Sequence, residues 1–195
     1  MAIETIKATE RARTGSGVLN AMRREGFVPS VVYGATENKN IKVNAKEFTD
    51  LLNASPSSQI LLNLEVEGAA PQKVFLQDLQ FDALTGAILH ADFMAVTEET
   101  VLTAKLPVVL LGEPKGVKAG GALEQLVHTL KVKALPKDLP ETIKADVTGL
   151  DLSESLTIGD VQFPEGVTPT LHDKVLIALV AMTRAAKSAG AGTEE

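Results

Sequence analysis

Residues 11–34 read RARTGSGVLNAMRREGFVPSVVYG and join a cationic segment to clear secondary-structure signals. Residues 11–24 hold four arginines and no acidic residue, although the chain has a net charge of −6. Gly15 and Gly17 precede a short helical segment, and Gly26 suits its end because glycine adopts the left-handed conformation at little cost. Arginine suits phosphate because its planar guanidinium donates parallel, charge-assisted hydrogen bonds. This stretch is the best candidate in the chain for contact with a polyanion.

Strand and helix signals continue on both sides of this stretch. Residues 2–10 alternate polar and apolar side chains as a half-buried strand does, and residues 29–33 form an apolar strand candidate that starts at proline. Asn44 and Glu47 give the capping signature of a helix start, followed by apolar residues at helical spacing. The other strands expected in the first half are residues 41–44, 59–66, 73–79 and 88–93. Six strands and two short helices predict a closed β-barrel, since closure leaves no exposed strand edge.

A second β domain is expected after residues 97–100, where a polar run interrupts the apolar pattern. Turns rich in proline and glycine separate its strand candidates, which are residues 101–111, 122–128, 130–135, 143–147 and 175–182. The last of these runs could also be a buried helix. We therefore predict a mainly β (α+β) fold, with a six-stranded barrel with short helices at residues 1–95, an antiparallel β domain at 96–184 and a flexible tail at 185–195.

The composition excludes several classes of protein. The chain has no cysteine, which rules out structural disulfides and thiolate metal sites. It shows no signal segment and no apolar run near the roughly 20 residues that cross a bilayer, so we expect a cytoplasmic protein without membrane contact. The acidic balance argues against coating nucleic acid through net charge. A polyanionic partner would have to meet a local basic patch.

His90 and Asp92 form the pair of greatest chemical interest, because alternate residues of a strand share a face. The pair could act as acid and base, bind sugar hydroxyls or form a simple exposed ion pair. The three histidines lack ligand-like spacing, the glycines at 15–17 and 112–121 match no nucleotide-binding motif, and no serine elbow is present. We therefore expect no metal, no cofactor and no enzyme activity. Two rivals remain: a small-ligand or hydrolytic barrel that uses this pair, and a stress-linked protein adaptor that uses the acidic second domain.

The chain resembles the bacterial large-subunit ribosomal protein family that binds 5S rRNA at three motifs in order: RREGFVPSVVYG at 23–34, QDLQ at 77–80 and HADF at 90–93. Its second half resembles the longer, two-domain form of that family, called CTC or general stress protein, at residues 116–124, 136–141 and 146–150. The resemblance implies a barrel similar to the anticodon-binding barrels of glutaminyl-tRNA synthetase, docked on the minor groove of 5S rRNA. It also implies a monomer on the large ribosomal subunit, with no small-molecule substrate.

The resemblance further implies which residues face the RNA. Arginines would hold phosphates, while amide, imidazole and carboxylate groups would form hydrogen bonds with sugar or base edges. The implied residues are Arg11, Arg23, Tyr33, Gln77, His90 and Asp92.

The chain departs from the family pattern in its basic segment. Family members usually carry cations at the positions of Ser16, Asn20 and Ala21. We therefore expect weaker RNA binding with a smaller salt dependence, because each lost phosphate contact lowers the salt slope by about one unit. Arg13 and Arg24, or the second domain, would compensate. We include Ser16, Asn20, Arg13 and Arg24 in the predicted RNA-binding set.

Overall fold

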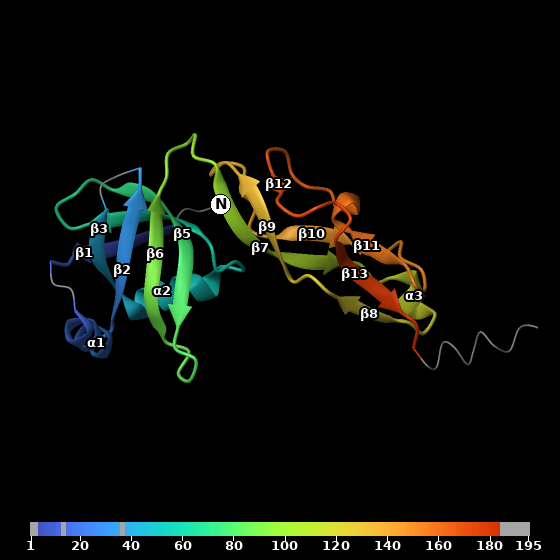
Figure 1. Cartoon of the computed structure of the whole chain (residues 1–195), viewed down its shortest axis with the longest axis horizontal. Coiled ribbons are helices and arrows are strands. Elements are labelled where there is room, and N and C mark those ends of the chain that lie inside the picture. The colour runs from blue at the N-terminus through green and yellow to red at the C-terminus, as the bar shows by residue number, and fades with distance from the viewer. Residues whose placement is uncertain (1–3, 13–14, 36–37, 184–195) are drawn as a thin grey trace, which may run out of the picture. The chain divides into compact units, whose positions relative to one another are not determined.

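The computed structural model describes residues 4–12, 15–35 and 38–183. The chain divides into two compact units, one comprising residues up to 104 with 135–137 and the other the remainder. Both units consist mainly of β-strands (Figure 1), which confirms the predicted mainly β class. No helix in the described ranges combines the length and the apolar character that crossing a membrane requires. Arg13 and the predicted tail at 185–195 lie outside the described residues.

The first unit contains a closed barrel with the strand order β1-β3-β2-β6-β5-β4, so the predicted six-stranded barrel is confirmed. The strands are β1 (Glu4–Glu10), β2 (Phe27–Gly34), β3 (Lys39–Asn44), β4 (Leu61–Val66), β5 (Gln72–Phe81) and β6 (Ile88–Ala95). Two pairs, β1 with β4 and β2 with β6, are parallel, and the others are antiparallel. Figure 1 shows β2, β6 and β5 side by side.

Two helices accompany the barrel in different ways. Helix α2 (Ala45–Ala54) starts at Asn44, whose side-chain oxygen accepts hydrogen bonds from the backbone N–H groups of the next turn. It inserts Phe48 and Leu51 into the barrel core, where the ring centroid of Phe48 lies 5.8 Å from that of Phe93. Helix α1 (Ser16–Arg24) has no buried residue and therefore lies on the barrel surface. Its end is followed by Gly26, with φ of +83°.

The second unit contains two sheets, with strand orders β10-β7-β9-β12 and β11-β13-β8. Its elements are β7 (Leu102–Leu111), α3 (Lys115–Lys118), β8 (Ala122–Gln125), β9 (Thr129–Ala134), β10 (Ile143–Asp146), β11 (Ser155–Thr157), the 3-10 helix η1 (Ile158–Asp160), β12 (Thr168–Pro169) and β13 (Leu176–Ala181). The run at 175–182, which could have been a helix, forms β13. Strands β11 and β12 escaped prediction because two or three residues are too short to show an alternating pattern.

One pairing in the second unit differs from the expected antiparallel arrangement. Strands β7 and β10 are parallel, with Ile143 opposite Val108 and Asp146 opposite Leu111. Alternation of buried and exposed residues is the same for both strand directions, so the sequence pattern could not distinguish them. The four-stranded sheet is therefore mixed.

Replacement of the helix cap tests the contribution of α2 to the barrel. Asn44→Ala removes the acceptor for the first turn of α2 and should lower the free energy of unfolding by about 1 kcal/mol. Tyr33 is the single tyrosine in a chain without tryptophan, so its fluorescence during urea unfolding reports on the first unit alone. Asn53→Ala, at an exposed position of the same helix, is the control. Equal unfolding midpoints for the two variants would contradict the role of the cap.

Candidate nucleic-acid interface

The strand register places one row of outward residues across four neighbouring strands. Asn40 of β3 lies opposite Val31 of β2, which lies opposite Asp92 of β6, which lies opposite Asp78 of β5. The residues that flank Asp92 along β6, Ala91 and Phe93, are buried in the core, so this row faces away from it. The row forms the middle of a surface on which most of the predicted RNA-binding residues lie.

His90 and Asp92 are joined directly on this surface. The Nδ1 atom of His90 lies 2.8 Å from a carboxylate oxygen of Asp92, and their side chains are 22% and 39% exposed. A neutral imidazole that donates from Nδ1 keeps Nε2 as an acceptor, and a protonated one donates from both nitrogens. The pair therefore presents fixed hydrogen-bonding groups at the surface.

Arg23 extends from α1 onto the edge of the same surface. Its Nε donates to the backbone carbonyl of Leu89 at 3.1 Å, and its Nη1 donates to the side-chain oxygen of Asn20 at 2.9 Å. These bonds use two of the five N–H donors of the guanidinium and leave three for a ligand. Asn20, which the sequence analysis placed in the RNA-binding set at the position of a missing cation, thus orients the neighbouring arginine, a role that the sequence did not reveal.

Arg11 is held in the same manner at the opposite side of the row. Its Nε donates to the carbonyl of Ile41 at 3.1 Å, and its Nη2 donates to the side-chain oxygen of Asn40 at 3.2 Å. Burial lowers the pKa of Arg11, although an arginine stays charged at neutral pH. Within the described part of the chain, neither Arg11 nor Arg23 has a carboxylate at ion-pair distance. Both guanidinium groups are therefore positioned while their charge stays uncompensated.

Tyr33 lies near the end of β2, two residues beyond Val31 and on the same face. Burial raises the pKa of its phenol, and the negative charges of Asp92 and Asp78 raise it further. The next residue, Gly34, has φ of +111°, and a Cβ atom there would lie 2.8 Å from the carbonyl oxygen of Ala95. Glycine at this position therefore allows β2 and β6 to stay closely paired beside the tyrosine.

Gln77 is the extra residue of a β-bulge. Leu76 and Asp78 pair with consecutive residues of β6, so Gln77 stands between them without an opposite residue. Its backbone carbonyl accepts a hydrogen bond from the side chain of Gln59. The bulge places Gln77 next to Asp78, which lies opposite Asp92 on the neighbouring strand. The sequence pattern had not indicated a bulge.

Three further predicted residues follow one stripe of α1. Ser16, Asn20 and Arg24 are spaced by four residues and are all exposed, as expected for one face of a helix. The stripe carries one full charge, that of Arg24.

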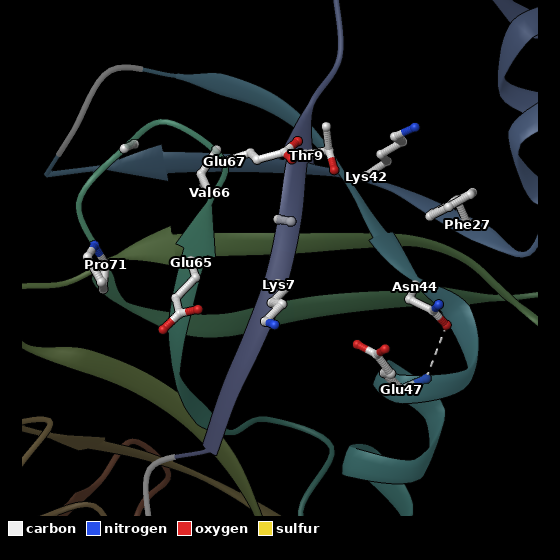
Figure 2. A pocket seen from close by; sticks show the side chains of 12 residues that line it. Lys7, Thr9, Phe27, Lys42, Asn44, Glu47, Glu65, Val66, Glu67 and Pro71 are labelled. Atoms are coloured by element: carbon white, nitrogen blue, oxygen red, sulfur yellow. Dashed lines mark hydrogen bonds between the residues drawn. The ribbon is translucent and has the colours of Figure 1, made fainter.

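Two hollows on the described part of the first unit lie elsewhere. An open hollow of about 550 Å³ extends over β1, β3 and β4, where Lys7 lies opposite Glu65 (Figure 2). A second, of about 310 Å³, lies between α2 and the β5–β6 hairpin. Neither is lined by His90 or Asp92. Among the described residues, no group of three or more His, Asp or Glu side chains could hold a metal ion.

Comparison with known proteins gives a consistent result for both halves of the chain. Residues 6–93 match the model of the Ribosomal L25p family, and residues 101–184 match that of the C-terminal domain of ribosomal protein TL5. The chain is 45% identical to the large ribosomal subunit protein bL25 of Akkermansia muciniphila over 92% of its own length and 89% of that protein. It is 38% identical to bL25 of Desulfatibacillum aliphaticivorans, over 95% and 87% of the two chains.

The pKa of Tyr33 offers a direct test of the geometry around Asp92. Asp92→Asn removes a nearby negative charge, so the pKa of Tyr33 should fall towards its ordinary value. Because the fold raises this pKa, the stabilisation of the neutral phenol is complete at neutral pH and is lost as pH rises through the folded-state pKa. Titration of the tyrosinate absorbance measures the shift without interference, since the chain has one tyrosine and no tryptophan. Asp50→Asn on α2 is the control, and equal titration curves for both variants would refute the arrangement.

Proposed function

Because the chain belongs to the bL25 family of large ribosomal subunit proteins, we propose that its first unit binds 5S rRNA and helps to hold it in the large subunit. The family is structural and not enzymatic. On this proposal the protein is associated with the ribosome, and the surface that runs from Arg11 to Arg23 is the RNA-binding face. A non-enzymatic family argues against acid–base catalysis by His90 and Asp92, and on this proposal the two side chains form hydrogen bonds with RNA.

The proposal depends mainly on one observation: the guanidinium groups of Arg11 and Arg23 are both held in place by uncharged hydrogen-bond acceptors. In both Arg11 and Arg23, the Nε–H donates to the backbone carbonyl of a strand residue, and one Nη donates to the side-chain oxygen of an asparagine. A guanidinium fixed by neutral acceptors keeps its full charge and loses little further side-chain entropy when it meets a phosphate. Structural arginines more often gain stability from carboxylate partners, and these two lack them among the described residues.

The groups between the arginines suit sugar and base edges. Asp92 and Asp78 are opposite each other on neighbouring strands and repel phosphate. Carboxylates accept hydrogen bonds from ribose 2′-hydroxyls and from amino groups of bases. These RNA groups are exposed in the wide, shallow minor groove of an RNA helix. In the proposed docking mode, RNA phosphates therefore contact the arginines at the rim of the surface, and sugar edges contact the aspartates at its centre.

Removal of one cation and of the imidazole tests the site. Arg23→Ala combined with His90→Ala should weaken 5S rRNA binding by about a hundredfold or more, since a hydrogen bond to a charged group contributes about 1.5–3 kcal/mol. A gel shift measures the affinity, and circular dichroism verifies that the barrel is intact. Lys46→Ala with His172→Ala removes the same kinds of charge from exposed positions elsewhere and should bind as the parent does. Unchanged affinity in a folded Arg23→Ala/His90→Ala variant would rule out the site.

A gain of charge on α1 tests the same surface in the other direction. Ser16→Lys adds a cation to the exposed stripe that holds Asn20 and Arg24, and it should strengthen 5S rRNA binding. The slope of log affinity against log salt should become steeper by about one unit, as expected for one additional phosphate contact. Asn53→Lys on α2 adds the same charge away from the stripe and serves as the matched control. Equal slopes for both lysine variants would show that α1 does not contact RNA.

A further inference from the structure

The outer face of the four-stranded sheet in the second unit carries a row of lysines. Residues alternate along these strands, so that Leu106, Val132 and Ala145 are buried on the inner side. The residues that flank these three along the strands point outward, and all of them except the half-buried Pro107 are exposed. The lysines on this outer face are Lys105 of β7, Lys131 and Lys133 of β9, and Lys144 of β10.

The balance of charge on this face is opposite to that of the chain. Asp146 is the single acidic residue in the four strands, and its carboxylate accepts hydrogen bonds from the backbone N–H and the hydroxyl of Thr148. Lys131, Lys133 and Lys144 have no carboxylate at ion-pair distance within the ranges that the structure describes. In a chain with a net charge of −6, the four strands thus hold four lysines and one acidic residue.

The spacing of the lysines is set by the sheet itself. Lys131 and Lys133 are alternate residues of β9 and lie about 7 Å apart along the strand. Lys144 lies on β10, which borders β7, and β7 borders β9, so its Cα is about 10 Å from that strand. The four strands contain no aromatic residue on which a base could stack. Such a face offers point charges at fixed intervals and no means of reading bases.

We propose that this lysine face, defined by Lys131, Lys133 and Lys144, is a second RNA-contacting surface that binds the phosphodiester backbone of ribosomal RNA. Lysine ammonium groups bind phosphate as point charges without fixed geometry, which suits contact independent of sequence. The partner is RNA because the protein belongs to a ribosomal family and the face is complementary in charge to phosphate. The inference does not depend on 5S rRNA binding by the first unit. The lysine face would supply positive charges in addition to the few that α1 carries.

The test uses the full chain and large ribosomal subunits from cells that lack the protein. The variant Lys131→Gln/Lys133→Gln/Lys144→Gln is compared with Lys115→Gln/Lys118→Gln/Lys174→Gln, which removes equal charge from the same unit outside the four strands. Retention on the subunits is measured as a function of salt. The first variant should lower the slope of log affinity against log salt by about two to three units, and the control should leave it unchanged. Equal slopes for the two variants would overturn the proposal.

Ultraviolet crosslinking of the loaded subunits distinguishes RNA from a protein partner. Nucleotide adducts on the peptides that contain β9 and β10 are expected, and crosslinks from these peptides to protein alone would overturn the proposal. The gel shift of the Arg23→Ala/His90→Ala variant with isolated 5S rRNA tests the first unit separately. A failure of either surface can therefore be recognised without reference to the other.

Discussion

The parallel pairing of β2 with β6 is the constraint on which the proposed interface depends. The two strands are separated by more than fifty residues of chain, yet Ser30 to Gly34 lie beside Ala91 to Ala95. This pairing closes the barrel between its two halves, and it places the carbonyl of Leu89 where Arg23 of α1 can reach it. Without it, the two halves of the barrel would be joined only by the β1–β4 pair, and the helix would not lie beside the His90–Asp92 pair. The hydrogen bonds of one strand pair therefore assemble residues from both ends of the first unit.

The sequence predicted the elements of the fold better than their partners. Alternation along β1 and the Asn44 cap of α2 are local signals, and both proved reliable because local energetics and the final core agree on them. Strand direction and register depend on contacts between distant residues, so the parallel β7–β10 pair could not be deduced. The position of Gln77 in a bulge and the bond from Arg23 to Asn20 were hidden for the same reason. The hydrogen bonds that hold Arg11, Arg23 and the His90–Asp92 pair became visible only in three dimensions.

The acidity of the chain restricts where a polyanion can approach. Exposed charges interact over about 8–10 Å at physiological salt, so the sum over the whole chain matters less than the charges around one contact. The positive charges of Arg11 and Arg23 are not neutralised within the described part of the chain, because the hydrogen-bond acceptors of both side chains are uncharged oxygens. The lysine face presents its charges differently. Residues alternate along β9 and β10, so the lysines point away from the core, and no hydrogen-bond partner among the described residues fixes their side chains. Arginines held by neutral oxygens and lysines spaced by a sheet are two physical ways in which an acidic protein can present local positive charge.

The stability of the barrel alone does not explain why two aspartates, Asp92 and Asp78, stand at the centre of the first surface. Two carboxylates directly opposite each other on neighbouring strands destabilise a sheet, and Asp92 also contacts Nδ1 of His90 at 2.8 Å. Asparagine at either position would keep the hydrogen-bonding capacity of the side chain and remove the repulsion. A carboxylate differs from an amide in being acceptor-only and charged. It therefore rejects phosphate oxygens and favours donors such as 2′-hydroxyls and base amino groups, which would direct the sugar edge of an RNA helix to the middle of the surface and its phosphates to the arginines at the rim.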